Sequence, residues 1–397
     1  MNEGKIAAAS VVREGGAAAA VCRMCFGKRL GFTFDKGVNE NRLYSPAVGD
    51  LVLELACDPS ELEDVEFITL GKTVNESVIT VGEETFAVDD LISKWMSPLE
   101  DVFPTDPKAI ITMDDVPVCH VRPSVSCARS HAKPAVFIPV FPGTNCENDS
   151  AAAFERAGAK VNMLVLRNLT STDIEDSIRA MADMIDDSQM IMIPGGFSGG
   201  DEPDGSAKFI ATTFRNPLIA GAVTELLDKR GGLILGICNG FQALVKLGLL
   251  PYGEIRDLTA DMPTLTFNTL GRHVSRMVNT RITSVKSPWL ALCDPGDVYT
   301  VPVSHGEGRF AASGEILRML ADNGQIATQY CDEYGTPSDD ITWNPNGSMY
   351  AIEGITSADG RIFGKMGHSE RCGENIAANI PGLKDMKIFA AGVEYFK

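Results

Sequence analysis

The chain has 397 residues, of which 44% are hydrophobic and 7% aromatic, and its formal net charge at pH 7 is −18. This length predicts two or three domains with enough apolar material for a core. The acidic balance argues against a nucleic-acid partner, because a phosphate backbone requires clustered Lys and Arg. No apolar run approaches the length of a membrane span. The ten cysteines are too dispersed for a disulfide framework, which favours a reducing cytoplasm.

Residues 1–115 have the pattern of a smaller α+β domain. We predict an Ala-rich helix after Gly15-Gly16, strands at 49–55 and 65–71, a hairpin over 77–88 and a short helix at 89–96. No catalytic constellation falls in this region. Cys22 and Cys25 form a C-x-x-C pair, but no second pair follows at zinc spacing, so we predict no metal site.

The composition changes over residues 97–134, which are rich in Pro, Asp and Ser and lack periodicity. We place the end of the first domain near residue 115 and a linker at 116–134. The cysteines and histidines of this segment fit no common zinc spacing, so we interpret them as solvent-facing: Cys119, His120, Cys127 and His131.

Residues 135–397 alternate strands and helices, which predicts an α/β domain with a parallel sheet. The predicted strands cover 136–141, 161–166, 189–193 and 233–238; the helices cover 150–158, 171–185 (capped by Ser171 or Thr172) and parts of 208–227. Ligands of parallel sheets gather beyond the carboxyl ends of the strands. That edge brings together the loops 141–145, 194–200 and 238–240.

The most informative motif is Gly236-Ile-Cys238-Asn-Gly240, a G-x-C-x-G pattern between a buried strand and a helix. It is a nucleophile elbow with sulfur in place of a hydroxyl, and glycines are needed where a sharp turn crowds the backbone. The helix N-terminus favours the thiolate of Cys238. The alternative is a buried structural cysteine.

A cysteine nucleophile needs a base and a group that orients the base. His368 follows a strand-like segment and has Glu370 two residues on, where an extended chain places both side chains on one side. His305 has the same relation to Glu307 and is the competing candidate. We favour His368.

The oxyanion donors should be the backbone N–H of Asn239 and one N–H from Gly195 or Gly196, because a Gly-Gly turn lets bare backbone approach a reacting carbonyl. The rival interpretation of residues 195–200 is a phosphate loop. The acidic run at 201–204 would repel a phosphate, and no Walker lysine is present.

Six segments together closely resemble the class I (triad) glutamine amidotransferase domain of phosphoribosylformylglycinamidine synthase, in its large single-chain form. They are Phe141–Glu147, Pro194–Gly205, Gly236–Gln242, His305–Arg309, Asn344–Ser348 and Gly367–Arg371. The resemblance covers residues 135–397 and implies a flavodoxin-like parallel sheet flanked by helices, with Cys238, His368 and Glu370 as the triad. It also implies that Gln242 and Gly195–Gly196 line the glutamine pocket, while His305, Glu307 and Arg309 face a partner synthetase domain.

Residues 1–115 resemble the latter part of the second AIR-synthetase-like domain of the same enzyme. The family's ATP-binding and formylglycinamide-ribotide-binding regions would lie upstream, so we expect the chain to begin inside a domain and to carry only the ammonia-producing half. The resemblance implies L-glutamine and the synthetase domains as partners. It implies no cofactor or metal for the glutaminase step, with ATP and Mg²⁺ needed only in the synthetase part.

These observations predict a glutaminase that supplies ammonia in purine biosynthesis through a γ-glutamyl thioester. Two alternatives are kept. In a cysteine hydrolase of the intracellular-protease superfamily a histidine usually follows the cysteine, whereas Asn239 follows here. A non-catalytic interaction fragment would be favoured by Cys238 and His368 lying far apart.

Overall fold

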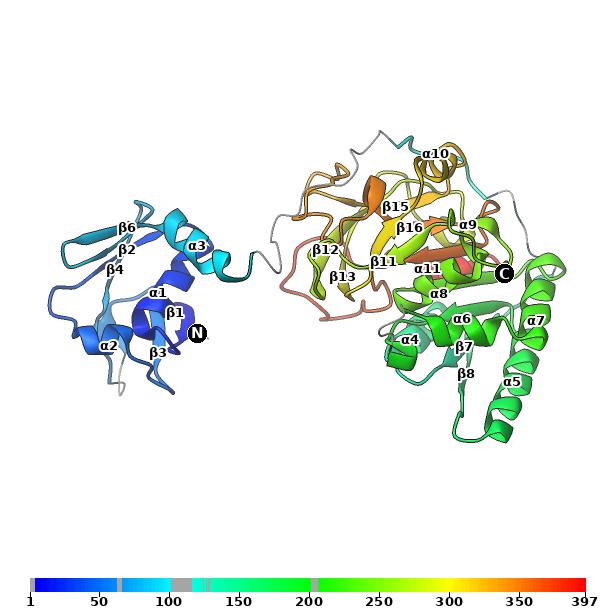
Figure 1. The fold of residues 1–397 in the computed structure, drawn as a ribbon, viewed down its shortest axis with the longest axis horizontal. Helices are drawn as coiled ribbons and strands as arrows, with labels where there is room; N and C mark the ends of the chain where they lie inside the picture. Colours follow the sequence, from blue (N-terminus) through cyan, green and yellow to red (C-terminus); the bar gives the residue numbers. More distant parts are fainter. Residues whose placement is uncertain are drawn as a thin grey trace. The chain divides into compact units, whose positions relative to one another are not determined.

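The computed structural model describes residues 4–62, 66–100, 116–123, 125, 127, 129–200 and 206–397. The chain divides into two compact units, Met1–Thr105 and Asp106–Lys397 (Figure 1). The acidic run at 201–204, Gly205 of the segment 194–205, the predicted domain end near 115 and the first residue of the strand predicted at 65–71 lie outside the described residues.

In its described residues, the smaller unit contains two sheets and three α-helices around an apolar core. β1 (Ile6–Val11) pairs antiparallel with β3 (Leu51–Leu55). The second sheet has the order β4 (Gly71–Val74), β2 (Gly31–Phe34), β5 (Val78–Val81), β6 (Glu84–Ala87). The helices are α1 (Gly16–Phe26), α2 (Glu40–Tyr44) and α3 (Val88–Met96). The hairpin predicted over 77–88 is present as β5–β6. Residues 66–70 are irregular, so the strand predicted there is wrong, and β4 begins at Gly71 instead.

In its described residues, the larger unit is built on a nine-stranded sheet in the order β13-β12-β15-β16-β17-β10-β9-β7-β8. Figure 1 shows β12 and β13 towards one side of this unit and β7 and β8 towards the other. Five strands form a parallel half: β7 (Ala135–Val140), β8 (Lys160–Val165), β9 (Met190–Ile193), β10 (Leu233–Ile237) and β17 (Ile362–Lys365). Four strands form an antiparallel half: β12 (Val274–Ile282), β13 (Val298–His305), β15 (Ile326–Cys331) and β16 (Ile352–Thr356). The expected α/β fold is therefore confirmed, but its sheet is mixed rather than parallel.

Helices connect the parallel strands, as a parallel sheet requires. They are α4 (Glu147–Ala157), α5 (Ser171–Asp186), α6 (Lys208–Phe214), α7 (Pro217–Asp228) and α8 (Asn239–Leu247). The cap of α5 is Thr170, whose hydroxyl accepts from Asp173 N, so the predicted caps Ser171 and Thr172 are wrong by one or two residues. Further elements complete the unit: α9 (Leu249–Tyr252), β11 (Thr264–Thr266), β14 (Arg309–Ala311), α10 (Gly314–Asp322) and α11 (Ile388–Glu394).

The core of the larger unit lies on both faces of the central strands. β10 is buried along its whole length, and Phe241 and Leu244 of α8 are fully buried against the sheet. Apolar side chains cover both faces of this strand, so any shift of the strand would disrupt packing on both sides. The position of its carboxyl end is therefore fixed. Within the described ranges, none of the helices combines the length and apolar character needed to cross a bilayer.

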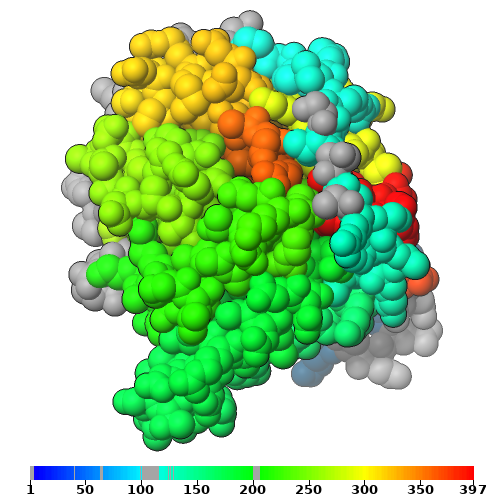
Figure 2. Space-filling view, turned by 90° about the vertical axis from the view of Figure 1, so that its right-hand side faces the viewer, coloured from blue at the N-terminus to red at the C-terminus, as the bar shows by residue number. Residues whose placement is uncertain are grey.

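The segment before β7 packs on the larger unit. Cys119 forms a strand-like bridge with Ser284, Arg122 donates to the carbonyl oxygens of Ala291 and Cys293, and His131 N donates to Phe396 O at 2.6 Å. Figure 2 shows the cyan part of the chain lying over yellow and red residues on this face. Described residues of the segment that we interpreted as a linker therefore have fixed partners in this unit.

Candidate active site

Cys238 occupies a strained turn between β10 and α8. Its backbone has φ 53° and ψ −106°, and its N–H donates to Lys365 O at 2.8 Å. A non-glycine residue in such a conformation costs free energy and is typical of nucleophile elbows. The residue is 5% exposed, and its Sγ lies 3.8 Å from Ser304 O at the end of β13.

The two glycines of the motif are required by close backbone contacts. A Cβ on Gly236 would lie 2.7 Å from the carbonyl group of Gly240. A Cβ on Gly240 would lie 1.9 Å from Ile193 O of the neighbouring strand. Any side chain at either position would push α8 away from the sheet. The G-x-C-x-G pattern therefore encodes the packing of the helix directly behind Cys238.

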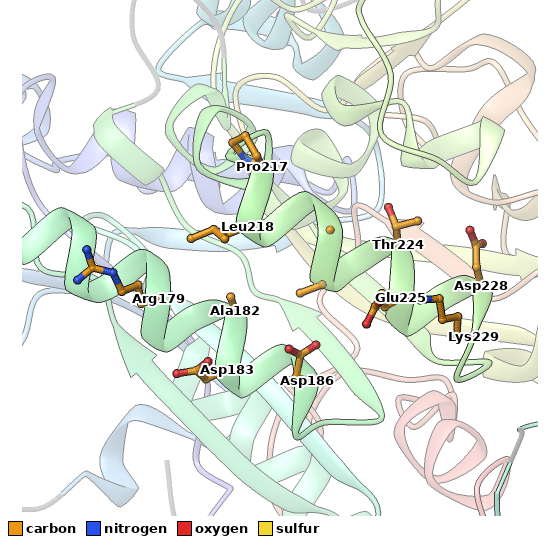
Figure 3. Close-up of a pocket in the computed structure, with 12 residues that line it drawn as sticks. Arg179, Ala182, Asp183, Asp186, Pro217, Leu218, Thr224, Glu225, Asp228 and Lys229 are labelled. Carbon is orange, nitrogen blue, oxygen red and sulfur yellow. Dashed lines mark hydrogen bonds and ion pairs between the residues drawn. The ribbon is translucent and has the colours of Figure 1, made fainter.

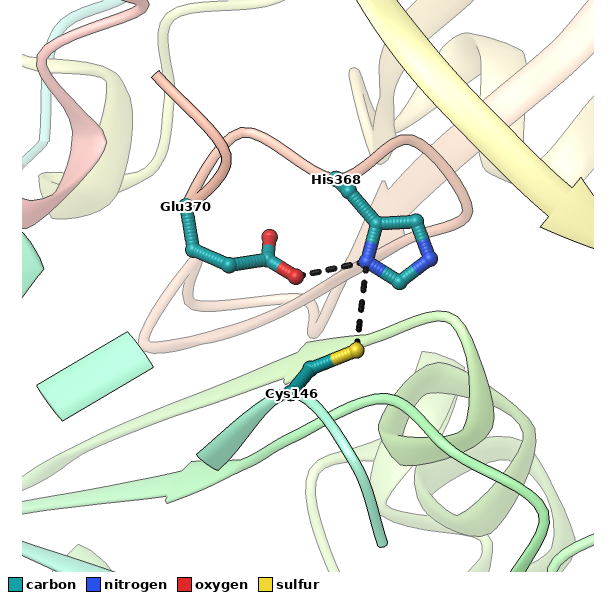
Figure 4. A group of neighbouring side chains, drawn as sticks. All are labelled: Cys146, His368 and Glu370. Carbon is teal, nitrogen blue, oxygen red and sulfur yellow. Dashed lines mark hydrogen bonds and ion pairs between the residues drawn. The ribbon is translucent and has the colours of Figure 1, made fainter. Parts of the chain in front are cut away.

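His368 and Glu370 lie in the loop that follows β17. His368 Nδ1 and Glu370 Oε1 are 2.5 Å apart, and each residue is 2% exposed (Figure 4). Burial by itself would lower the pKa of His368. The Glu370 carboxylate and contacts with the thiols of Cys146 and Cys238 outweigh burial and hold this pKa well above its usual value. Because Nδ1 is hydrogen-bonded to Glu370, Nε2 is the nitrogen that can exchange a proton with a nucleophile or leaving group.

Cys146 is a second thiol beside this histidine, and sequence reasoning did not assign it a role. Its Sγ lies 3.8 Å from His368 Nδ1 and 3.0 Å from Asn145 Oδ1, and Arg371 Nη2 donates to it at 3.2 Å. The available signal was its position: the loop predicted to reach the site ends at Asn145, one residue earlier. Cys146 is the residue immediately before α4 and is almost fully buried.

Cys146, His368 and Glu370 also have the ligand types of a metal site, since their ligand atoms lie within 4.8 Å of one another. Two ligands on a tetrahedral zinc ion are roughly 3.3 Å apart, given metal–ligand distances of about 2.0 Å. The 2.5 Å between Nδ1 and Oε1 is instead a hydrogen-bond length, and the Arg371 cation already contacts the sulfur. We therefore interpret the group as a hydrogen-bonded cluster.

Gly195 is the point where these side chains meet. A Cβ there would lie 2.7 Å from His368 Cε1, 3.1 Å from Cys146 Sγ and 3.4 Å from Cys238 Cβ. The next residue, Gly196, has φ 149°, and a Cβ on it would lie 2.7 Å from Thr144 Cα. The bare backbone of Gly195 thus packs against both cysteines and the imidazole. The three predicted loops do meet at this edge of the sheet.

The predicted residues of α8 connect the elbow to the loop after β13. Asn239 is the first residue of the helix; its Oδ1 accepts from Ser198 N at 3.3 Å, and its Nδ2 donates to Gln242 Oε1 at 2.9 Å. Gln242 Nε2 donates to Glu307 O at 2.5 Å. Both ends of the Gln242 amide are therefore engaged by the protein itself.

His305 and Glu307 lie inside the larger unit, and they do not pair with each other. His305 is 2% exposed, neither ring nitrogen has a hydrogen-bond partner, and burial together with the charges of His368 and His273 lowers its pKa to about 3. The Glu307 carboxylate accepts from the N–H of Ser206 at 2.9 Å and from its hydroxyl at 2.5 Å. Arg309 is half-buried in β14, opposite Thr266.

The structure thus groups Cys238, His368 and Glu370 and leaves His305 without a carboxylate partner. The wide separation of Cys238 and His368 that would have favoured a non-catalytic fragment is not observed, because a single Cβ on Gly195 would lie 2.7 Å from His368 Cε1 and 3.4 Å from Cys238 Cβ.

A surface groove elsewhere lacks the chemistry of this site. It lies between α5 and α7 and is lined by Asp183, Asp186, Glu225 and Lys229, among others (Figure 3). It contains no cysteine or histidine, and its Lys229–Glu225 pair is an exposed helix-surface ion pair. The groove therefore lacks both residue types of the Cys238–His368 pair.

Comparison with known proteins identifies matches over the larger unit. Residues 133–396 match the model of the CobB/CobQ-like glutamine amidotransferase domain. Phosphoribosylformylglycinamidine synthase subunit PurQ of Aquifex aeolicus is 35% identical over 246 residues, which is 62% of this chain and 93% of that protein. The subunit of the same name from Methanococcus maripaludis is 35% identical over 287 residues, covering 66% of this chain and 97% of that protein. A solved structure of PurLQS from Thermotoga maritima is 26% identical and covers 67% of this chain and all of that chain, with a TM-score of 0.48.

Proposed function

The chain belongs to the CobB/CobQ-like glutamine amidotransferase family, and we propose that Cys238, His368 and Glu370 hydrolyse L-glutamine as the ammonia-supplying part of phosphoribosylformylglycinamidine synthase. The observation that carries this proposal is the buried His368–Glu370 pair beside a cysteine on a strained elbow. Its relatives are named as subunits of that synthase.

In the first half of the reaction, the thiolate of Cys238, beside protonated His368, attacks the carboxamide carbon of glutamine. The carbonyl oxygen becomes an oxyanion next to the N-terminus of α8, where the backbone N–H of Asn239 and one N–H of the Gly195–Gly196 turn can donate to it. The C–N bond then breaks. The imidazolium of His368 donates its proton to the leaving nitrogen, which gives ammonia and a γ-glutamyl thioester. The raised pKa of His368 favours its protonated form before this step.

In the second half, water attacks the thioester carbonyl while neutral His368 accepts its proton. The C–S bond breaks, glutamate leaves, and Cys238 regains its starting form with the imidazole again protonated beside it. Glu370 remains hydrogen-bonded to Nδ1 in both halves, so it fixes the ring and balances the positive charge each time that charge forms.

We also propose how the ammonia is used. The ammonia would be consumed in an ATP- and Mg²⁺-dependent amination of formylglycinamide ribotide, carried out by synthetase domains in the cytoplasm. Sequence resemblance supports assigning residues 1–115 to the latter part of an AIR-synthetase-like domain of the large single-chain enzyme. No cofactor is needed for the glutaminase step itself, because cysteine and histidine supply the nucleophile and the proton.

The test is covalent labelling of the full chain with a glutamine-like electrophile, followed by peptide mass spectrometry and a glutaminase assay. We expect one label per chain, at Cys238, and loss of nearly all turnover in Cys238→Ala and His368→Ala. Cys331→Ala is the matched control, because burial raises the pKa of Cys331 to about 12 and keeps it unreactive. Turnover at the unmodified rate in either of the first two variants would contradict the assignment.

A further inference from the structure

A buried ion pair lies directly behind the loop that carries His368. Lys365, the last residue of β17, and Glu353 of β16 are both fully buried, and Lys365 Nζ is 3.0 Å from Glu353 Oε1. Removing two charges from water costs several kcal/mol each, and an apolar pair of similar size is often as stable. The presence of this pair is therefore not explained by stability alone.

The two charged groups bind opposite sides of one residue, Gly367. Its N–H donates to Glu353 Oε1 at 2.6 Å, and its carbonyl oxygen accepts from Lys365 Nζ at 2.8 Å. β17 ends two residues earlier, so the sheet ladder no longer satisfies these buried backbone groups. A buried N–H or C=O without a partner is costly, and the ion pair supplies both partners.

The remaining oxygen of Glu353 is also held. Thr280 Oγ1 donates to Glu353 Oε2 at 3.3 Å, and the hydroxyl of Thr328 donates to the same oxygen. The carboxylate therefore has little freedom to turn away from Gly367. Gly367 itself fits closely, because a Cβ there would lie 2.6 Å from Val301 Cγ2 and 2.9 Å from Glu353 Oε1.

The same few residues also determine where the nucleophile sits. Lys365 O accepts from Cys238 N at 2.8 Å, and on the other side of Gly367 the N–H of His368 donates to Pro302 O at 2.9 Å. Lys365 thus contacts the elbow through its backbone and Gly367, the residue before the imidazole, through its side chain. Movement of this lysine would change the separation of Cys238 and His368.

We propose that Lys365 and Glu353 are positioning residues that hold the Gly367 peptide and so set His368 at its working distance from Cys238. This inference rests on the proposed function of Cys238 and His368. The pair touches neither the substrate nor the reacting atoms, so its effect should appear in the reactivity of Cys238 rather than in the affinity for glutamine.

The experiment replaces the pair by apolar residues of similar volume, Glu353→Leu with Lys365→Met, in the full chain. We expect a folded protein, because both charges are removed together. Alkylation of Cys238, followed by mass spectrometry of its peptide, should slow by about tenfold or more, since an error of about 1 Å in the geometry can cost a hundredfold. The pH profile of this alkylation, which depends on the protonation of His368, should also change, and kcat should fall more than KM rises.

The matched control is Asp359→Asn with Arg361→Met. This pair also joins two charged residues next to β17, but it lies before the strand and is partly exposed, at 36% and 19% of the side chain. Its loss should leave the alkylation rate and the pH profile of Cys238 unchanged. The inference is overturned if the apolar double variant folds and its Cys238 is alkylated at the unmodified rate with the unmodified pH profile.

Amide hydrogen exchange in the unmodified chain keeps the inference testable if the double variant does not fold. Gly367 N–H should be protected as strongly as Met366 N–H, which donates to Glu353 O at 3.0 Å. Exchange of Gly367 at the rate of exposed loop amides would refute the inference. Absence of glutaminase activity in the unmodified chain would contradict the proposed function instead, because alkylation and amide exchange do not depend on glutamine turnover.

Discussion

Two loops of the larger unit carry the same local pattern and produce opposite electrostatics. The loop after β13 contains His305 with Glu307 two residues on, and the loop after β17 contains His368 with Glu370 two residues on. Both histidines are 2% exposed. Yet burial lowers the pKa of His305 to about 3, whereas the pKa of His368 is held well above its usual value.

The difference comes from where each carboxylate points. Glu370 turns back to His368 Nδ1, while Glu307 binds Ser206 and leaves both nitrogens of His305 without a partner. Burial disfavours the charged form of both rings, so only the paired ring can remain an imidazolium. The i, i+2 spacing makes such a pairing possible but does not decide it.

The largest expected effect separates the two histidines directly. His368→Gln should lower glutaminase turnover on the order of 10⁴-fold, because it removes the proton carrier for both halves of the reaction. His305→Gln should change turnover by less than about tenfold, since a general acid–base is worth at least about 10². The measurement is kcat for both variants, with circular dichroism to show that each is folded. A larger loss in the folded His305 variant would reverse the assignment.

The next comparison tests the carboxylates. Glu370→Gln should lower turnover by roughly 10²- to 10⁴-fold, as expected for the residue that orients a catalytic imidazole. It should also lower the pKa of His368, because the main interaction opposing burial is removed. The pH dependence of Cys238 alkylation would show this as a shift of the imidazole titration to lower pH. Glu307→Gln is the control and should leave that titration in place; equal shifts in both variants would contradict the comparison.

A steric substitution tests how closely the site is packed. In Gly195→Ala the new Cβ would lie 2.7 Å from His368 Cε1, so the ring must move and turnover should fall by about 10². Gly221→Ala in α7 is the control, because a Cβ there meets nothing within 4 Å and alanine favours a helix by up to about 1 kcal/mol. We expect unchanged turnover and a slightly higher Tm for this control. Normal activity in Gly195→Ala would show that its Cβ is accommodated without moving the ring.

Much of the site could be predicted because its chemistry is encoded locally. The strand, turn and helix around Cys238 are adjacent in sequence, and Gly236 and Gly240 indicate the close packing of the helix behind the elbow. The local pattern favoured His368 but could not settle the choice against His305, because that choice depends on whether Ser206 binds the Glu307 carboxylate. Cys146 was missed because its contact with His368 spans 222 residues. The antiparallel half of the sheet was missed because the βα repeats that predict a parallel sheet all lie before residue 238, whereas β12–β13 and β16–β17 pair as antiparallel neighbours.

The remaining expected effect is on stability, and it has opposite signs for the two histidines. An unfolded histidine titrates near 6.5. The folded pKa of His305 is about 3, so its neutral form contributes stability that is fully present above about pH 6.5 and is lost as the pH falls towards 3. The folded pKa of His368 is raised, so its contribution is fully present below about pH 6.5 and is lost as the pH rises through the folded value. Each group changes the free energy of unfolding by at most about 1.4 kcal/mol per pH unit.

Urea unfolding between about pH 4 and 9 would measure both slopes. A Trp95→Phe background removes the tryptophan of the smaller unit, so that fluorescence reports the larger one, where Trp289 is fully buried. Relative to that background, His305→Gln should flatten the acid side of the stability profile, and His368→Gln should flatten the alkaline side. If the stability profiles of both variants instead run parallel to that of the background at every pH, neither histidine changes its pKa on folding. Their opposite pKa shifts would then fail to account for why only one loop is suited to proton transfer.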